Sequence, residues 1–92
     1  MTVVPTAYEP KRVGEVERRE IRWIGALGSD TLSTSVWSVE PAGLTLASPQ
    51  IVGTVTSILV SAGVSKTTYE ISNTVTTGQG HTLIEVVLLY VI

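Results

Sequence analysis

Alternation of apolar and polar side chains is clearest near the carboxyl end of the chain. In "TYEISNTVT", Tyr69, Ile71, Asn73 and Val75 fall on one side, and threonine, serine and glutamate fall on the other. A period of two with one polar side predicts a strand that has one face on a core and one face in water. The glycine-rich "TGQGH" that follows predicts a hairpin turn into a final strand that begins at Thr82.

The final strand does not alternate. Its sequence, "LIEVVLLYVI" over residues 83–92, has a single charge, Glu85, and is apolar on both sides. If one side fills the core, about four large aliphatic side chains remain on the other, and burying each is worth about 1.5–3 kcal/mol. That total is comparable with the whole stability of a small domain. We therefore expect another protein surface to cover the residues of the second side, which are Ile84, Val86, Leu88, Tyr90 and Ile92.

The first ten residues contain Pro5 and Pro10 and show no sustained period. Because residues before proline avoid the α region, this stretch is predicted to be an extended arm. The arm adds Val3, Val4 and Tyr8 to the expected interface. These three side chains are too few to cover the last strand, so another subunit is the expected cover.

The middle of the chain is rich in short β patterns separated by turn residues. Residues 11–22, "KRVGEVERREIR", fit either a weakly amphipathic helix or a strand with Ile21 and Trp23 on one face, and the strand is preferred. A turn is predicted from Gly25 to Asp30, and no helix is expected. About six or seven short strands at this spacing predict an all-β fold, a small immunoglobulin-like antiparallel β-sandwich. It would occupy residues 11–92 after an arm over residues 1–10.

The predicted core consists of aromatic and β-branched side chains on the inward sides of these strands, namely Trp23, Trp37, Val39, Tyr69, Ile71 and Val75. Tryptophan is expected in the core, and not as a sugar-stacking platform, because the chain has no phenylalanine to fill that space. Trp37 is preferred over Trp23 as a core residue. Tyr69 opens its strand as the tyrosine of an immunoglobulin-like corner does, and its role is predicted to be structural.

Composition and charge narrow the function classes. Charged residues make up 15% of the chain and the net charge is -2, which argues against a nucleic-acid partner. Five of the six basic residues lie in residues 11–22 among glutamates, which predicts a solvated, self-compensating stretch or an interface stripe. The start lacks the pattern of a signal peptide, and the apolar end has about half the roughly 20 residues of a membrane helix. No membrane association is expected.

Candidate chemistry is sparse. The single histidine, His81, follows a glycine turn without a nucleophile and acid beside it, which predicts a surface residue and not a catalytic one. The chain has no cysteine, and the acids from Asp30 onward are scattered singly, so we expect no metal site, no cofactor and no small-molecule substrate. "GQG" lacks the lysine and the helix of a phosphate loop. The protein is predicted not to be an enzyme.

The order of these motifs across residues 20–82 resembles a known family. The quoted features are a Ser29-Asp30-Thr31 turn, a Trp37-Ser38-Val39 strand, the turn from Pro41 to Thr45, the stretch from Leu59 to Gly63, the strand from Tyr69 to Thr77, and Gly80-His81-Thr82. They look like the small immunoglobulin-like virion proteins of tailed phages, of the fiber–tail adaptor type. The resemblance implies a non-enzymatic structural protein, made in the host cytoplasm and built into the virion.

The same resemblance implies partners. They are other virion proteins, namely portal, adaptor, tail or fiber subunits, together with copies of the protein itself. Its implied station is the head–tail junction or the tail. Two alternatives remain open on the sequence: a capsid decoration protein of similar fold, which stabilises the head from outside, and a carbohydrate-binding module, which would need a row of exposed aromatic residues.

Overall fold

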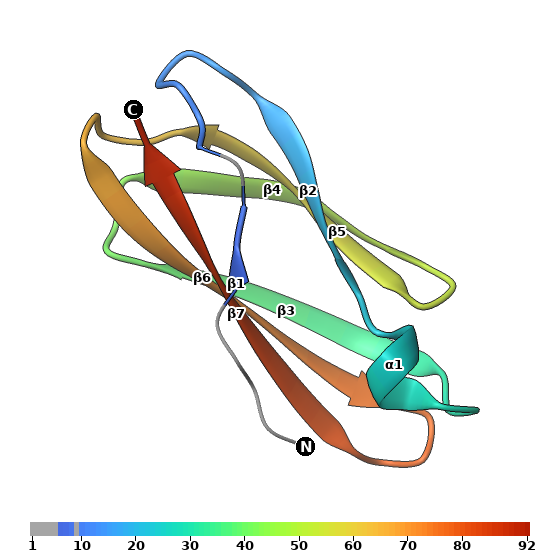
Figure 1. Cartoon of the computed structure of the whole chain (residues 1–92). Coiled ribbons are helices and arrows are strands. Elements are labelled where there is room, and N and C mark those ends of the chain that lie inside the picture. Colours follow the sequence, from blue (N-terminus) through green and yellow to red (C-terminus); the bar gives the residue numbers. More distant parts are fainter. Residues whose placement is uncertain (1–5, 9) are drawn as a thin grey trace.

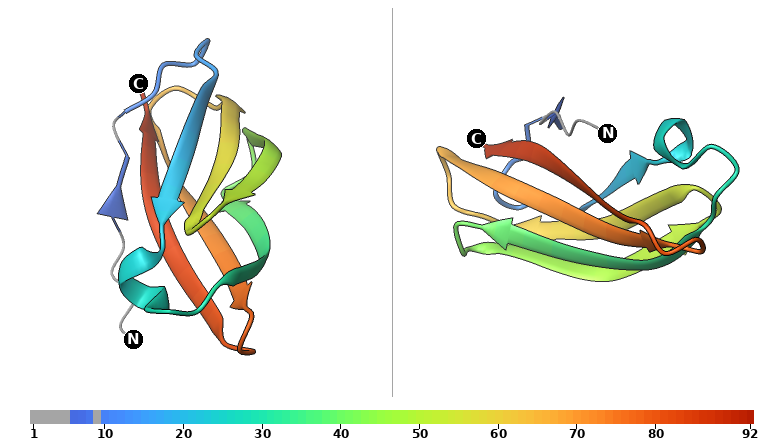
Figure 2. Two further views of the ribbon diagram at one scale, coloured as in Figure 1. Left: turned by 90° about the vertical axis from the view of Figure 1, so that its right-hand side faces the viewer. Right: turned by 90° about the horizontal axis from the view of Figure 1, so that it is seen from below.

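A computed structural model of the chain describes residues 6–8 and 10–92. This part of the chain forms strands β1 (Thr6–Ala7), β2 (Glu17–Arg22), β3 (Leu32–Glu40), β4 (Leu44–Val52), β5 (Val55–Ala62), β6 (Thr67–Thr77) and β7 (Thr82–Val91), and one helical turn, α1 (Ile24–Leu27) (Figure 1). The strands build two sheets, ordered β1-β7-β6-β3 and β2-β5-β4. The sheets pack face to face (Figure 2), which confirms the predicted all-β sandwich.

Strand β7 lies inside the larger sheet and has a neighbour on each side. It pairs with β6 in antiparallel register, from Thr76 opposite Thr82 to Thr67 opposite Val91. On its other side runs the N-terminal segment, where β1 is parallel to β7 and the backbone of Lys11 bonds to both Tyr90 and Ile92. The described part of the predicted arm is therefore fastened along the last strand (Figure 1).

The core lies between the sheets in two clusters of buried side chains. One contains Leu44, Ile58, Val60, Tyr69, Ile71, Leu89 and Val91, and the other contains Ile21, Trp23, Leu27, Val75 and Val87. Trp37 and Val39 are only half-buried against them, because their strand, β3, is at the edge of its sheet. Trp23 is the better covered tryptophan, with 1% of its surface exposed. The preference for Trp37 over Trp23 as a core residue is thus reversed in the structure.

A short helix replaces part of the turn predicted between Gly25 and Asp30. In α1 the backbone N–H groups of Ala26 and Leu27 both bond to the carbonyl oxygen of Trp23, at 2.9 and 3.0 Å. Leu27 is buried in the core cluster that contains Trp23, and it anchors the turn. The prediction of no helix is wrong here, because a four-residue helix is too short to show a helical period in the sequence.

A chain of buried hydrogen bonds crosses the core from sheet to sheet. The indole N–H of Trp23 donates to the Thr56 hydroxyl at 2.9 Å, and that hydroxyl donates to the Asn73 side-chain oxygen at 2.6 Å. The Asn73 amide in turn donates to the Ser35 hydroxyl and to the Val36 carbonyl oxygen. Buried polar groups are tolerated when each has a partner, so this network fixes how the two sheets face each other.

Tyr69 ties the start of β6 to the loops at one end of the sandwich. It is fully buried, and its hydroxyl accepts a hydrogen bond from the Val64 backbone N–H at 2.8 Å. Gly43 lies against it at a φ of 127°, and a Cβ atom there would come within 2.9 Å of the hydroxyl oxygen. Gly43 is therefore required both by the backbone conformation and by the tyrosine.

Candidate docking surface on the outer sheet face

The residues expected to be covered by a partner lie on the outside of the larger sheet. Alternate residues of β7 and the residue after it point away from the core, and we name them the outer β7 row: Ile84, Val86, Leu88, Tyr90 and Ile92. Val86 is half-buried, and the other four are exposed by 36% (Leu88) to 53% (Ile92). The residues between them from Val87 onward, Val87, Leu89 and Val91, are buried. Four of the five residues of the outer β7 row are thus exposed, and Ile92 at its end also borders a hollow that Pro10 and Arg12 line.

The neighbouring strand gives this row a polar border. On β6 the residues opposite the row are short or charged: Thr68 lies opposite Tyr90, and Ser72 lies opposite Val86. Because Thr68 and Ser72 are short, Tyr90 and Val86 project farther from the outer face of the sheet than they do. The outer face is therefore an apolar strip beside a low polar strip, which is the arrangement of an apolar contact with a polar rim.

A shallow hollow of about 440 Å³ lies on this face where β3 ends and β6 begins, and it is lined by Glu40, Pro41, Thr68, Glu70 and Leu88. Glu40 and Glu70 are directly opposite each other on β3 and β6. Neither carboxylate takes part in the ion pairs found among the described residues. Like charges in such a cross-strand pair repel each other, so a cation placed in the hollow by a partner would be favoured.

The predicted interface residues of the arm have a different position. Val3 and Val4 lie outside the described residues. Tyr8 packs against both core clusters of its own domain, and its hydroxyl donates to the Glu20 carbonyl oxygen at 3.0 Å. Burial raises the pKa of this hydroxyl to about 12, although the nearby Arg19 guanidinium acts in the opposite direction. Tyr8 thus fastens the N-terminal segment to β2 within one molecule.

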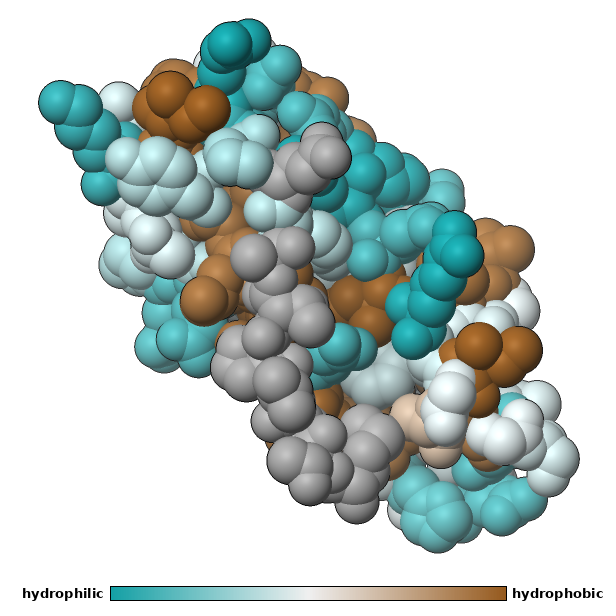
Figure 3. Space-filling view, viewed as in Figure 1, coloured by the Kyte–Doolittle hydropathy of each residue, from teal (hydrophilic) through white to brown (hydrophobic). Residues whose placement is uncertain are grey.

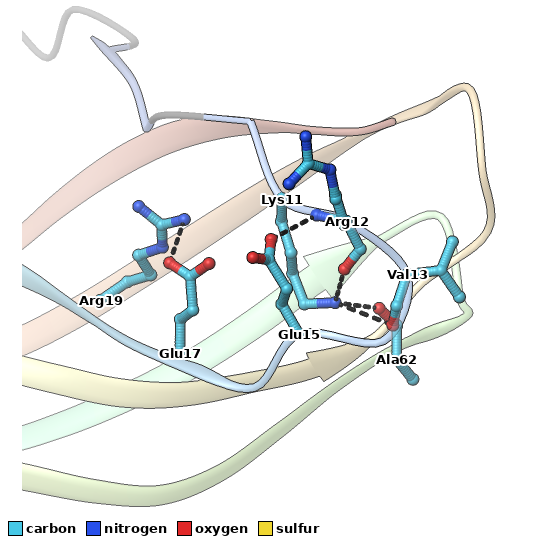
Figure 4. A network of polar contacts seen from close by, with 7 residues as sticks. All are labelled: Lys11, Arg12, Val13, Glu15, Glu17, Arg19 and Ala62. Atoms are coloured by element: carbon cyan, nitrogen blue, oxygen red, sulfur yellow. Dashed lines mark hydrogen bonds and ion pairs between the residues drawn. The ribbon is translucent and has the colours of Figure 1, made fainter.

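Lys11 lies at one end of the sandwich. It is buried, although the sequence predicts a solvated stretch over residues 11–22. Its side chain is fully buried, and its ammonium group donates to three carbonyl oxygens: Arg12 at 2.7 Å, Val13 at 3.2 Å and Ala62 at 2.6 Å (Figure 4). Around it, the Glu15 carboxylate accepts from the Arg12 backbone N–H at 2.8 Å. No local sequence signal marks Lys11, because all three of its acceptors are backbone atoms.

A second exposed apolar group lies at the other end of the molecule. It consists of Ile24 on α1 together with Ile51 and Val52 at the hairpin between β4 and β5. The two elements are joined by a hydrogen bond from the Trp23 backbone N–H to the Thr54 carbonyl oxygen at 2.9 Å. Figure 3 shows hydrophobic surface at this end of the molecule.

Asp30 and His81, two polar residues considered in the sequence analysis, lie together where two loops meet. The Asp30 carboxylate accepts from the backbone N–H groups of Thr31 and Gln79, and it lies 3.6 Å from the His81 ring. A hydrogen bond from Thr77, followed by those backbone bonds and the His81 charge, lowers the pKa of Asp30. Asp30 therefore ties the loop before β3 to the turn between β6 and β7.

Glu85 is the one charged residue on the inward side of β7. It lies opposite Asn73 and is half-buried, and burial raises the pKa of its carboxyl group.

Among residues 6–8 and 10–92, no three histidine or acidic side chains gather as metal ligands would. Nor does this part of the chain contain a helix long and apolar enough to cross a membrane.

The two packed sheets define a small all-β sandwich domain with an exposed apolar row on the outer face of one sheet. Over residues 11–90 the chain matches the family described as the podophage GP4 fiber-tail adaptor protein gp77, and it belongs to that family. No match is found among curated proteins. The family match confirms the resemblance seen in the order of the motifs. It implies a structural component of a phage virion that contacts other tail and fiber proteins.

Proposed function

We propose that the protein is a non-enzymatic adaptor that joins neighbouring subunits of a podophage virion at the head–tail junction or where fibers attach. The outer β7 row is proposed as its docking surface. The observation that carries this proposal is that four of the five side chains in the row are exposed: three on β7 itself, Ile84, Leu88 and Tyr90, and Ile92 directly after it. Exposed apolar rows of this kind are a hazard in a free protein and are typical of surfaces that bind another protein.

We propose further that the fold is immunoglobulin-like. In a constant-type immunoglobulin sandwich, strands B, E and D lie in one sheet and strands G, F and C lie in the other. The sheets β2-β5-β4 and β7-β6-β3 have that order when β2 to β7 are read as strands B to G. The bond between the Tyr69 hydroxyl and the backbone at Val64 supports the same reading.

The proposed partner presents an apolar surface with a cationic side chain that reaches the hollow between Glu40 and Glu70. Leu88 lines that hollow and belongs to the outer β7 row, so one residue connects the apolar and the acidic parts of the surface. Such a partner would desolvate the apolar strip and neutralise the two carboxylates at once. Electrostatic matching of this kind sets orientation and partner choice more than it sets affinity.

The substitution Leu88→Lys tests this proposal. Leu88 is exposed, so the isolated domain should stay folded, and the new ammonium group would lie beside Glu70, the residue directly opposite on β6. It would occupy the place proposed for the partner's cation and put a charge into the apolar contact, so docking should be lost. We expect at least about a tenfold loss of the protein from purified particles assembled with the variant as the sole copy, measured by quantitative mass spectrometry.

The matched control is Val16→Lys. Val16 is 60% exposed in the loop before β2, away from the outer sheet face, and it should be incorporated normally. If Leu88→Lys is incorporated as well as Val16→Lys, the outer β7 row is not the docking surface and the proposal fails.

A further inference from the structure

The edges of the two sheets differ in how they are protected from pairing with another strand. Strand β2 has charged side chains at all positions but Ile21, and β4 contains Pro49 and a bulge between Ala47 and Gln50. The free side of β7 is occupied by the N-terminal segment. Charges, proline, bulges and covering segments are the usual devices that keep an edge strand from pairing with a second chain.

Strand β3 is the other edge of the larger sheet, and it has little of this protection. It pairs with β6 on one side, and no described segment pairs with its other side (Figure 2). Its nine residues, "LSTSVWSVE", contain no lysine and no proline, and the single charge, Glu40, is at the end. Its bulge lies between Leu32 and Thr34, at the opposite end, so the middle of the strand is regular and open.

The sequence of β3 is complementary to itself. In an antiparallel pair centred on Val36, that residue faces its own copy, Thr34 faces Ser38, and Leu32 faces Glu40. No like charges meet, and paired hydroxyl and β-branched side chains are favourable cross-strand neighbours. Val36 is 63% exposed on the outer face, and its copy would cover it. The two copies would be related by a two-fold axis perpendicular to the joined sheet. The outer faces of their larger sheets would therefore lie on the same side of the dimer.

We propose that β3 pairs with β3 of a second copy, in antiparallel register centred on Val36. The contact joins two four-stranded sheets into one continuous sheet and is isologous, as in most homodimers. It does not use the outer β7 row, which lies two strands away and stays free in both copies. The dimer therefore presents two docking rows on one side. Because a single strand pair buries a modest area, dimerisation depends on concentration.

Single cysteines test the register, since the chain has none of its own. Directly opposed residues in antiparallel strands have Cα atoms about 4.5–5.5 Å apart, which is within the range of a disulfide. Under mild oxidation Val36→Cys should form a covalent dimer at least about ten times faster than the exposed control Val16→Cys. Thr34→Cys and Ser38→Cys should cross-link mainly with each other when the two variants are mixed. Cross-linking of Val36→Cys no faster than Val16→Cys would overturn the proposal.

Charge substitutions at the axis give an independent test that does not need oxidation. Sedimentation equilibrium of the wild type should show a mass that rises toward twice that of the chain with increasing concentration. Val36→Lys and Val36→Glu should each stay monomeric with an unchanged melting temperature, because like charges meet at the axis, and their equimolar mixture should dimerise again. A wild type that is monomeric at its highest soluble concentration contradicts the proposal, as does a mixture that stays monomeric.

The two proposals can fail separately. A dimer that is lost in Leu88→Lys and kept in Val36→Lys would show that self-association uses the outer β7 row, and pairing through β3 would be wrong. Normal incorporation of Leu88→Lys into particles would instead reject docking through the row and leave pairing through β3 untouched.

Discussion

Replacement of Lys11 by methionine is expected to destabilise the domain by about 3–5 kcal/mol. Methionine matches the length and apolar stem of the lysine but donates no hydrogen bond. The carbonyl oxygens of Arg12, Val13 and Ala62 then lose the donor that they share, at a part-buried site beside the fully buried Lys11 stem. For a domain of this size the change corresponds to a fall in melting temperature of more than about 12 °C, measured by circular dichroism.

The control for this prediction is Lys66→Met, because Lys66 is exposed in the turn before β6. Its loss should change the melting temperature by less than about 3 °C. Equal melting temperatures for the two variants would show that the three bonds to Lys11 contribute nothing to stability.

Replacement of Thr56 by valine is expected to cost about 2–4 kcal/mol, although valine has nearly the same shape. The change removes the acceptor of the Trp23 indole N–H and the donor to the Asn73 oxygen, and both partners stay buried. Two unsatisfied polar groups in the core are the physical cause of the loss. The free energy of unfolding in urea measures it.

Thr56→Ser is the matched variant, because it keeps the hydroxyl and removes only a methyl group. We expect it to be more stable than Thr56→Val, with a loss of about 1 kcal/mol. If serine proves the more damaging substitution, packing and not the hydrogen-bond network governs this position.

The parts of the fold that the sequence predicts are those set by local period. Tyr69, Ile71 and Val75 alternate with polar residues, and the structure buries all three. The final strand is apolar on both sides, and in the structure one side fills the core while the other is exposed. A period of two is enough to assign each residue to its side. A proline within a strand indicates an edge, and Pro49 lies in β4, an edge strand that continues past it through a bulge.

The parts that the sequence does not predict depend on contacts between distant residues. Lys11 lies in a stretch of mixed charge, yet its acceptor at Ala62 is 51 positions away and is a backbone atom. Tyr8 looks like an arm residue available to a neighbour, but its hydroxyl reaches the backbone of Glu20 in the same chain. Trp23 is the better buried tryptophan because it packs in a cluster with residues as distant as Val75 and Val87, and its indole N–H bonds to Thr56 on β5. None of these partners is marked by spacing or period.

Only part of the candidate docking surface can be predicted from the sequence. The outer β7 row follows from the period of the last strand alone. The pairing of Glu40 with Glu70 requires the register between β3 and β6, which no local pattern provides. The apolar group at α1 and the β4–β5 hairpin likewise arises from tertiary contact, since Ile24 and Val52 are far apart in the chain.

The central claim is that another virion protein covers the outer β7 row, and thiol labelling of Leu88→Cys tests it most directly. In a chain without other cysteines, the rate of alkylation reports access to this one position. The isolated protein should be labelled readily, and the same variant in intact particles should react at least about ten times more slowly, while Val16→Cys reacts at similar rates in both. Labelling of Leu88→Cys in particles at the rate of the free protein would contradict the account.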